Sequence, residues 1–140
     1  MNWIFFALLS AFFAALTAIL AKIGIKDVNS NLATAVRTIV ILVFAWGIVF
    51  FQGTYKQIPS LSRFSLIFLV LSGLATGLSW LFYFRALQLG NASQVAPIDK
   101  LSIVLTVILS VFILGEKVTI PLLIGVALMV VGAVIVGYAR

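Results

Sequence analysis

Asp99 and Lys100 are the residues whose type and position most strongly suggest chemistry, because both are ionisable and both fall within a long apolar stretch. An ionisable side chain inside a membrane is costly and usually faces a cavity or a partner. We therefore expect Asp99 to exchange a proton or to bind a cationic group, with Lys100 as a candidate charge partner. The alternative is structural. Pro97 would then start a helix, the helix dipole would stabilise Asp99 in the first turn, and Lys100 would extend to the headgroups.

Arg37 is a second candidate charge partner, near the start of another apolar stretch and beside Thr34 and Thr38. It either faces the same cavity as Asp99 or lies at the membrane interface. Lys22 and Arg85, which lie close to the ends of apolar stretches, are expected to extend toward the headgroups.

Hydroxyl-bearing side chains recur at spacings of three and four residues, which places them on one helix face. Two such stripes stand out, on the third and fourth apolar stretches. The first contains Ser72, Thr76, Ser79 and Tyr83, and the second contains Asp99, Ser102, Thr106 and Ser110. Together they predict a polar pathway for a substrate or coupling ion. Alternatively, each hydroxyl bonds to a carbonyl one turn back or joins two helices.

The elements that would position these residues are apolar runs of membrane-spanning length. A bilayer core about 30 Å thick needs roughly 20 apolar residues in a helix. Hydrophobic residues make up 64% of the 140-residue chain and charged residues 9%, against about 45–50% and 25% in soluble domains. The runs cover approximately residues 3–25, 32–51, 64–87, 93–114 and 118–138. We expect an all-α integral membrane bundle of five transmembrane helices, forming one domain over residues 1–140.

The last run differs from the others because it carries no polar side chain from Pro121 to Gly137. Small residues at helical spacing let helices approach closely. We expect Gly125 and Gly132 on this run, and Gly73 and Gly77 on the third, to serve helix packing. The first four helices would line the polar pathway.

The inventory of reactive residues argues against an enzyme. The chain has no histidine and no cysteine, and its three acids are Asp27, Asp99 and Glu116. The commonest general base, the commonest metal ligand and thiolate chemistry are therefore missing. We expect no catalytic site, metal site or cofactor. The net charge of +6 comes from scattered Lys and Arg residues and forms no basic patch, so nucleic acid is not an expected partner.

Basic residues flanking the five runs are nearly balanced across the membrane. Lys56, Arg63 and Lys117 fall on the N-terminal side, and Lys22, Lys26, Arg85 and Arg140 fall on the other. Adding Arg37 and Lys100 to the second side favours an outward N-terminus under the positive-inside rule. The near-balance also permits insertion in both orientations.

Three segments carry a family resemblance. They are Tyr83–Pro97 (YFRALQLGNASQVAP), Leu109–Lys117 (LSVFILGEK) and Ile124–Gly132 (IGVALMVVG). They resemble the EamA domain of the drug/metabolite transporter superfamily, in which such segments join the third, fourth and fifth helices. The resemblance covers essentially the whole chain. Full-length members more often have apolar residues and a proline where this chain has Ile98–Ser102.

The resemblance implies a half-length, five-helix member of the bacterial and archaeal branch. Most members carry two inverted five-helix repeats, and binding sites in such transporters lie between the repeats. With one repeat, a second copy would supply the other half. We therefore expect a homodimer, for which an antiparallel arrangement is possible. It would be surrounded by lipids in the cytoplasmic (inner) membrane. It would export small metabolites or drugs by alternating access. The alternatives are a non-transporting scaffold or accessory subunit, a membrane enzyme acting on lipid, and a flippase for a lipid-linked substrate.

Overall fold

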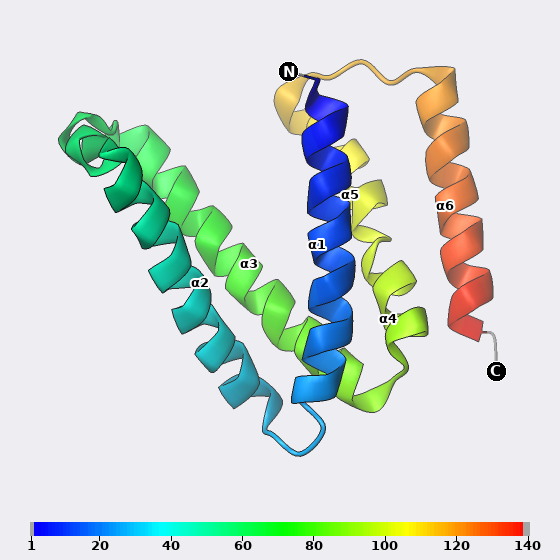
Figure 1. Cartoon of the computed structure of the whole chain (residues 1–140). Helices are drawn as coiled ribbons and strands as arrows, with labels where there is room; N and C mark the ends of the chain where they lie inside the picture. The colour runs from blue at the N-terminus through cyan, green and yellow to red at the C-terminus, as the bar shows by residue number, and fades with distance from the viewer. Residues whose placement is uncertain (1, 139–140) are drawn as a thin grey trace. The chain divides into compact units, whose positions relative to one another are not determined.

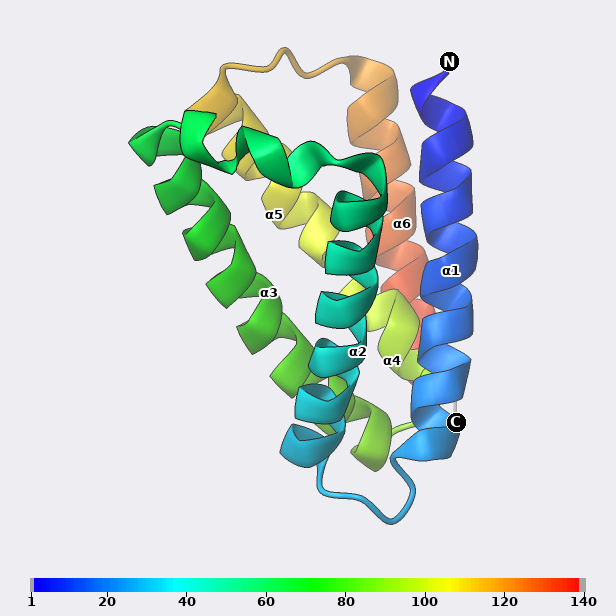
Figure 2. The ribbon, with the colours of Figure 1, turned by 60° about the vertical axis from the view of Figure 1, so that its left-hand side comes forward.

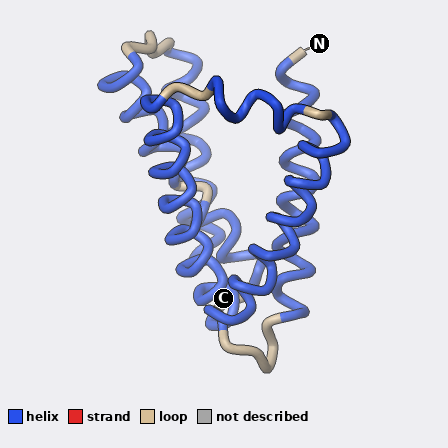
Figure 3. The backbone as a smooth tube through the Cα atoms, turned by 90° about the vertical axis from the view of Figure 1, so that its left-hand side faces the viewer, coloured by secondary structure: helices blue, strands red, loops and turns tan. Residues whose placement is uncertain are grey.

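The structure is a computed structural model that describes residues 2–138, and it is helical over most of that range, with no strand in it (Figure 3). Five segments are long and apolar enough to cross a membrane, as the sequence predicts. They are α1 (Trp3–Gly24), α2 (Ser30–Gln52), α3 (Arg63–Leu89), the broken segment Ala92–Leu114, and α6 (Ile120–Tyr138). Arg140, which enters the charge count, lies outside the described residues.

The helix ends follow from local chemistry. Asn29 caps α2, and its side-chain oxygen accepts hydrogen bonds from the N–H groups of Asn31 at 2.9 Å and Leu32 at 3.3 Å. Gly53 and Gly115 end their helices with φ of 69° and 68°, a left-handed conformation that glycine adopts without steric cost. The segment between α2 and α3 contains a 3₁₀ helix, η1 (Thr54–Ser60).

The fourth membrane segment differs from the single continuous helix that its apolar run predicts. It consists of α4 (Ala92–Asp99), α5 (Ser102–Leu109) and a π-helical turn, η2 (Ser110–Leu114). Lys100 and Leu101 separate α4 from α5.

The chain divides into two compact units, of which one is Ile23–Gln88 and the other contains the remaining described residues. In the second unit, α6 packs mainly against α4 and less against α5 (Figure 1). The two helices approach closely at Gly137, where a Cβ atom would lie 2.8 Å from Cδ1 of Ile98. In the same unit, Lys22 Nζ donates a hydrogen bond to the carbonyl of Gly90 at 2.7 Å.

The unit Ile23–Gln88 contains α2, η1 and α3. The two long helices diverge toward η1 (Figure 2), and they meet where Arg37 contacts the rings of Trp80 and Phe84. Gln88 Nε2 donates to the carbonyls of Val28 at 2.6 Å and Ile25 at 3.3 Å, which ties the end of α3 to the loop before α2.

Most large apolar side chains lie on the outer surfaces of these units. Phe51, Phe112 and Tyr138 are examples, each almost fully exposed. In water such a surface would be unfavourable, but in a bilayer lipid tails cover it. The exposed apolar surface therefore agrees with the five membrane-spanning segments.

Candidate functional site

The break in the fourth segment overturns the structural interpretation of Pro97. Asn91 has extended backbone angles, and its carbonyl accepts hydrogen bonds from the N–H groups of Gln94 and Val95 at 3.0 and 2.9 Å. The helix thus begins at Ala92, and Pro97 is an interior residue of α4 rather than its first position. Asp99 consequently ends α4, where the helix dipole disfavours a negative charge.

The backbone at the break forms a tight right-handed turn. The N–H groups of Leu101, Ile103 and Val104 each donate to the carbonyl three residues earlier, at 3.0 Å in all three cases. This is the 3₁₀ pattern in place of the α-helical one, and a stretch of it within a longer helix often marks a functional hinge.

Asp99 and Lys100 form an ion pair across this turn. Lys100 Nζ lies 3.3 Å from Oδ2 of Asp99, and 57% of the lysine side chain and 34% of the aspartate side chain are exposed. The structure thus brings the two predicted charge partners together. Whether the pair couples transport stays a prediction.

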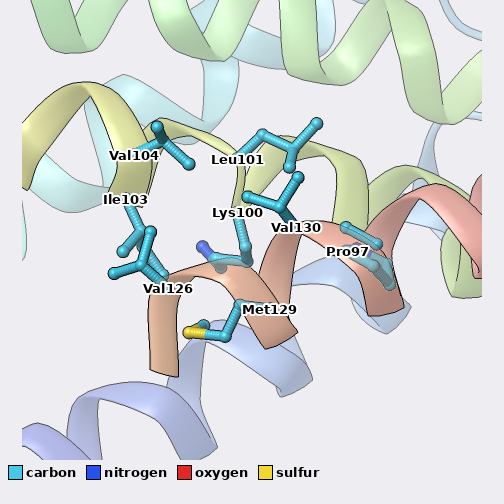
Figure 4. A pocket seen from close by; sticks show the side chains of 9 residues that line it. Pro97, Lys100, Leu101, Ile103, Val104, Val126, Met129 and Val130 are labelled. Carbon is cyan, nitrogen blue, oxygen red and sulfur yellow. The ribbon is translucent and has the colours of Figure 1, made fainter. Parts of the chain in front are cut away.

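A cavity of about 220 Å³ lies between the break and α6. One wall comes from residues around the break, and the other comes from α6 (Figure 4). The lining residues are Pro97, Lys100, Leu101, Ile103 and Val104 at the break, and Val126, Met129, Val130 and Ala133 on α6. Lys100 is the one charged residue among the lining side chains. An apolar cavity with one cationic group at its edge is suited to a small amphipathic molecule.

This cavity uses residues that the polarity pattern misses. The sequence predicts that α6 serves only packing, but its apolar side chains form one wall. Ser102 and Thr106 do not line the cavity, although they follow Asp99 in the predicted stripe. Their spacing puts them on the face of Asp99 only if one continuous helix runs through these residues, and the break interrupts that helix. The cavity wall formed by α6 is apolar, so a prediction based on the spacing of polar residues does not identify it.

Several stripe hydroxyls bond to their own helix, which is the alternative that the sequence left open. Thr106 Oγ1 donates to the carbonyl of Ser102 at 3.0 Å, and Thr76 Oγ1 donates to that of Ser72 at 2.9 Å. Ser110 Oγ donates to the Val107 carbonyl at 3.0 Å. Ser72, Thr76 and Ser79 are exposed on α3. Their role in a pathway stays a prediction, and it requires another part of the protein or a second chain to cover this face of α3.

Arg37 is placed on α2 against two aromatic rings of α3. Its guanidinium carbon lies 4.3 Å from the centre of the Trp80 ring and 5.3 Å from that of Phe84. Tyr83, a predicted pathway residue, packs its ring edge-on against Phe84, with 6.4 Å between the ring centres. Trp80 and Phe84 are not among the site residues predicted from the sequence. Their spacing of four, which puts both on one face of α3, is the signal that could have found them.

The four glycines predicted to pack helices have open space around them. Within its own unit, a Cβ atom at Gly73, Gly77, Gly125 or Gly132 would meet no other heavy atom within 4 Å. The packing role therefore stays a prediction about a neighbouring chain. Over residues 2–138, no group of three or more Cys, His, Asp or Glu side chains is placed to hold a metal ion.

Known proteins are similar to this chain in sequence. A model of the EamA-like transporter family matches residues 1–138. An uncharacterized transporter in the cobO 3′ region of a Sinorhizobium species is 51% identical over 134 residues, which cover 96% of this chain and 95% of the relative. An uncharacterized protein of Methanocaldococcus jannaschii is 29% identical over 86 residues, which cover 61% of this chain and 63% of that protein. No solved structure matches.

The match over residues 1–138 agrees with the three motifs that carry the resemblance, and the Sinorhizobium relative is itself of half length. The family and the name of that relative point to transport rather than catalysis. With its five membrane-spanning segments, the chain is a multi-pass membrane protein, and it belongs to the EamA-like transporter family as a half-length, five-helix member.

Proposed function

We propose that this chain is a secondary transporter that exports small metabolites or drugs across the cytoplasmic membrane by alternating access. The observation that carries the proposal is the break at Lys100–Leu101, with the Asp99–Lys100 ion pair beside an apolar cavity. Discontinuous helices commonly form substrate and ion sites in transporters, because their broken ends expose backbone and charged groups within the membrane.

Asp99 is the proposed coupling residue. When its carboxylate is ionised, it pairs with the Lys100 ammonium, and when it is protonated, that attraction is lost. Proton uptake would thus release Lys100 toward the cavity that it lines. A single protonation would therefore change the charge presented to a bound molecule, which is what coupled transport requires.

The proposed working unit is a homodimer embedded in lipid. One repeat supplies half of the two-fold site typical of such transporters. Open space at Gly73, Gly77, Gly125 and Gly132 would allow a second copy to approach closely. The near-balance of flanking basic residues is compatible with an antiparallel pair.

The test uses protein reconstituted in vesicles that contain the pH-sensitive dye pyranine. A pH gradient is imposed, and small acids, amines, amino acids and neutral drugs are added one at a time. We expect at least one compound to accelerate proton movement through the wild-type protein. Asp99→Asn should abolish that coupled movement while the protein remains inserted and folded.

Asp27→Asn is the matched control, because Asp27 carries the same group in the loop between α1 and α2. It should retain coupled movement. Full coupling in Asp99→Asn would refute the assignment of Asp99. If no compound drives proton movement in the wild type, the scaffold or the flippase for a lipid-linked substrate takes precedence.

A further inference from the structure

Arg37 carries a charge within a membrane-spanning helix without a carboxylate to balance it in its own unit. The one acidic residue in Ile23–Gln88 is Asp27, in the loop before α2, and no ion pair or hydrogen bond from Arg37 is found within that unit. Its contacts there are the faces of Trp80 and Phe84, and Tyr83 lies close enough to interact with its charge. An arginine in this position is expensive and is normally paired or functional.

Arg37 lies inside α2 rather than at its end, and its side chain packs against α3. Arg37 lies seven residues after Ser30, the first residue of α2, which is about 10 Å along the helix. Trp80 lies nine residues before the end of α3 at Leu89, or about 13 Å along that helix. The side chain rests on α3 at this depth, where an arginine that extended to the headgroups would not.

We infer that Arg37, Trp80 and Phe84 form a binding site for the carboxylate of an apolar organic acid. The inference rests on the proposed transport function and names its substrate class. A guanidinium over an aromatic face keeps its N–H groups free, and their planar fork matches the two oxygens of a carboxylate. The rings hold the cation by cation–π attraction and offer apolar surface to the body of the acid.

The charges around the site favour an acid over an amine. An ammonium substrate would be repelled by Arg37. Asp99, the one acidic residue within a membrane segment, is already paired with Lys100. A carboxylate instead supplies the counter-charge that Arg37 lacks in its own unit.

The test uses Trp80 as its own reporter. Trp3 and Trp46 are replaced by phenylalanine, which leaves Trp80 as the single tryptophan, since the chain contains three. The protein is placed in phosphatidylcholine nanodiscs and titrated with phenylacetate, with its neutral analogue phenylacetamide as the matched probe. We expect a saturable change in Trp80 fluorescence with phenylacetate and only a weak, non-saturating change with phenylacetamide.

Arg37→Gln should weaken phenylacetate binding by about 10- to 100-fold, the range expected for one lost charge-assisted contact. Arg37→Lys keeps the charge but not the planar fork, so it should bind with intermediate affinity. Arg85→Gln is the control, since Arg85 is an arginine on α3, the helix of Trp80, and its side chain bonds to Gln88 instead of the two rings. It should bind phenylacetate as the reporter protein does. Equal responses to acid and amide, or unchanged binding in Arg37→Gln, would overturn the inference.

Two further measurements distinguish a substrate carboxylate from a lipid headgroup, and binding from transport. Phosphatidylglycerol is added to the nanodiscs, so that a lipid phosphate can compete as the anion. If that lipid changes Trp80 fluorescence through Arg37 and phenylacetate does not, the carboxylate assignment is wrong. Phenylacetate uptake is then measured in vesicles. Binding through Arg37 without transport would contradict the proposed function alone, whereas transport that is independent of Arg37 would contradict this inference alone.

Discussion

Lys22 donates a hydrogen bond of 2.7 Å to the carbonyl of Gly90, and so joins the end of α1 to the turn that follows α3. The carbonyl belongs to a residue just past a helix end, where no helical N–H is available to it. Lys22→Met removes the donor but keeps a long apolar stem. We expect a loss of about 1–2 kcal/mol in unfolding free energy, typical of a charge-assisted bond in a partly exposed site.

The measurement is reversible unfolding in mixed detergent micelles. Lys26→Met is the control, because Lys26 is exposed in the loop after α1. Equal stability of Lys22→Met and Lys26→Met would contradict a structural role for the bond.

Gly137 of α6 packs closely against Ile98 of α4. A Cβ at Gly137 would meet two side-chain atoms of Ile98, at 2.8 and 3.2 Å. Gly137→Val should therefore cost about 1–3 kcal/mol, as overpacked contacts do. Gly132→Val adds the same side chain where no atom lies within 4 Å, so it should be much milder.

The same unfolding assay tests the contact. Trimming Ile98 to Val in the Gly137→Val background should recover part of the loss, because the atom nearest to the new side chain is then gone. If Ile98→Val recovers none of the lost unfolding free energy, the destabilisation by Gly137→Val does not come from its contact with Ile98.

The ion pair at the break predicts that stability and coupling respond differently to substitution. Lys100→Met leaves the Asp99 carboxylate unpaired beside an apolar cavity, at a cost of about 1–3 kcal/mol. Asp99→Asn combined with Lys100→Met removes both charges and should restore much of that stability without restoring proton-coupled transport. Measuring unfolding and vesicle transport on the same preparations separates the two roles. If the double variant regains transport, the pair serves only folding.

Membrane orientation can be read directly, because the chain contains no natural cysteine. Single cysteines at Asn29, just before α2, and at Lys56, in η1 just after it, mark the opposite ends of α2. An antiparallel homodimer requires each cysteine to be labelled from both sides of intact cells at similar levels. Labelling of each position from one side only would favour a parallel pair or a different partner chain.

Hydropathy and length were sufficient to predict the five membrane segments, because the bilayer sets a minimum apolar length that few other structures satisfy. The break was not predicted. Lys100 and Leu101 are ordinary helix formers, and Pro97 favours a helix start, because proline costs about 3 kcal/mol in a helix interior. The outcome depends on Asn91, whose extended backbone places the helix start five residues earlier.

The charged residues of the candidate site were predicted from the sequence, but their contacts were not. Asp99, Lys100 and Arg37 can be identified from the sequence alone, because a charged side chain in an apolar, membrane-spanning run costs free energy and is usually paired or functional. What contacts each charge depends on which helix faces meet, and sequence spacing fixes the faces of one helix without fixing its neighbour. The contact between Arg37 and Trp80 is therefore known only from the structure. The sequence does show that Trp80 and Phe84 share one face of α3.

The position of the break within its segment has a geometric consequence for a pair of chains. The fourth segment, Ala92–Leu114, has Ile103 at its centre, four residues beyond Asp99. Asp99 thus lies about 6 Å off the middle of the segment. In an antiparallel homodimer the two carboxylates would be staggered across the bilayer by about 12 Å along its normal.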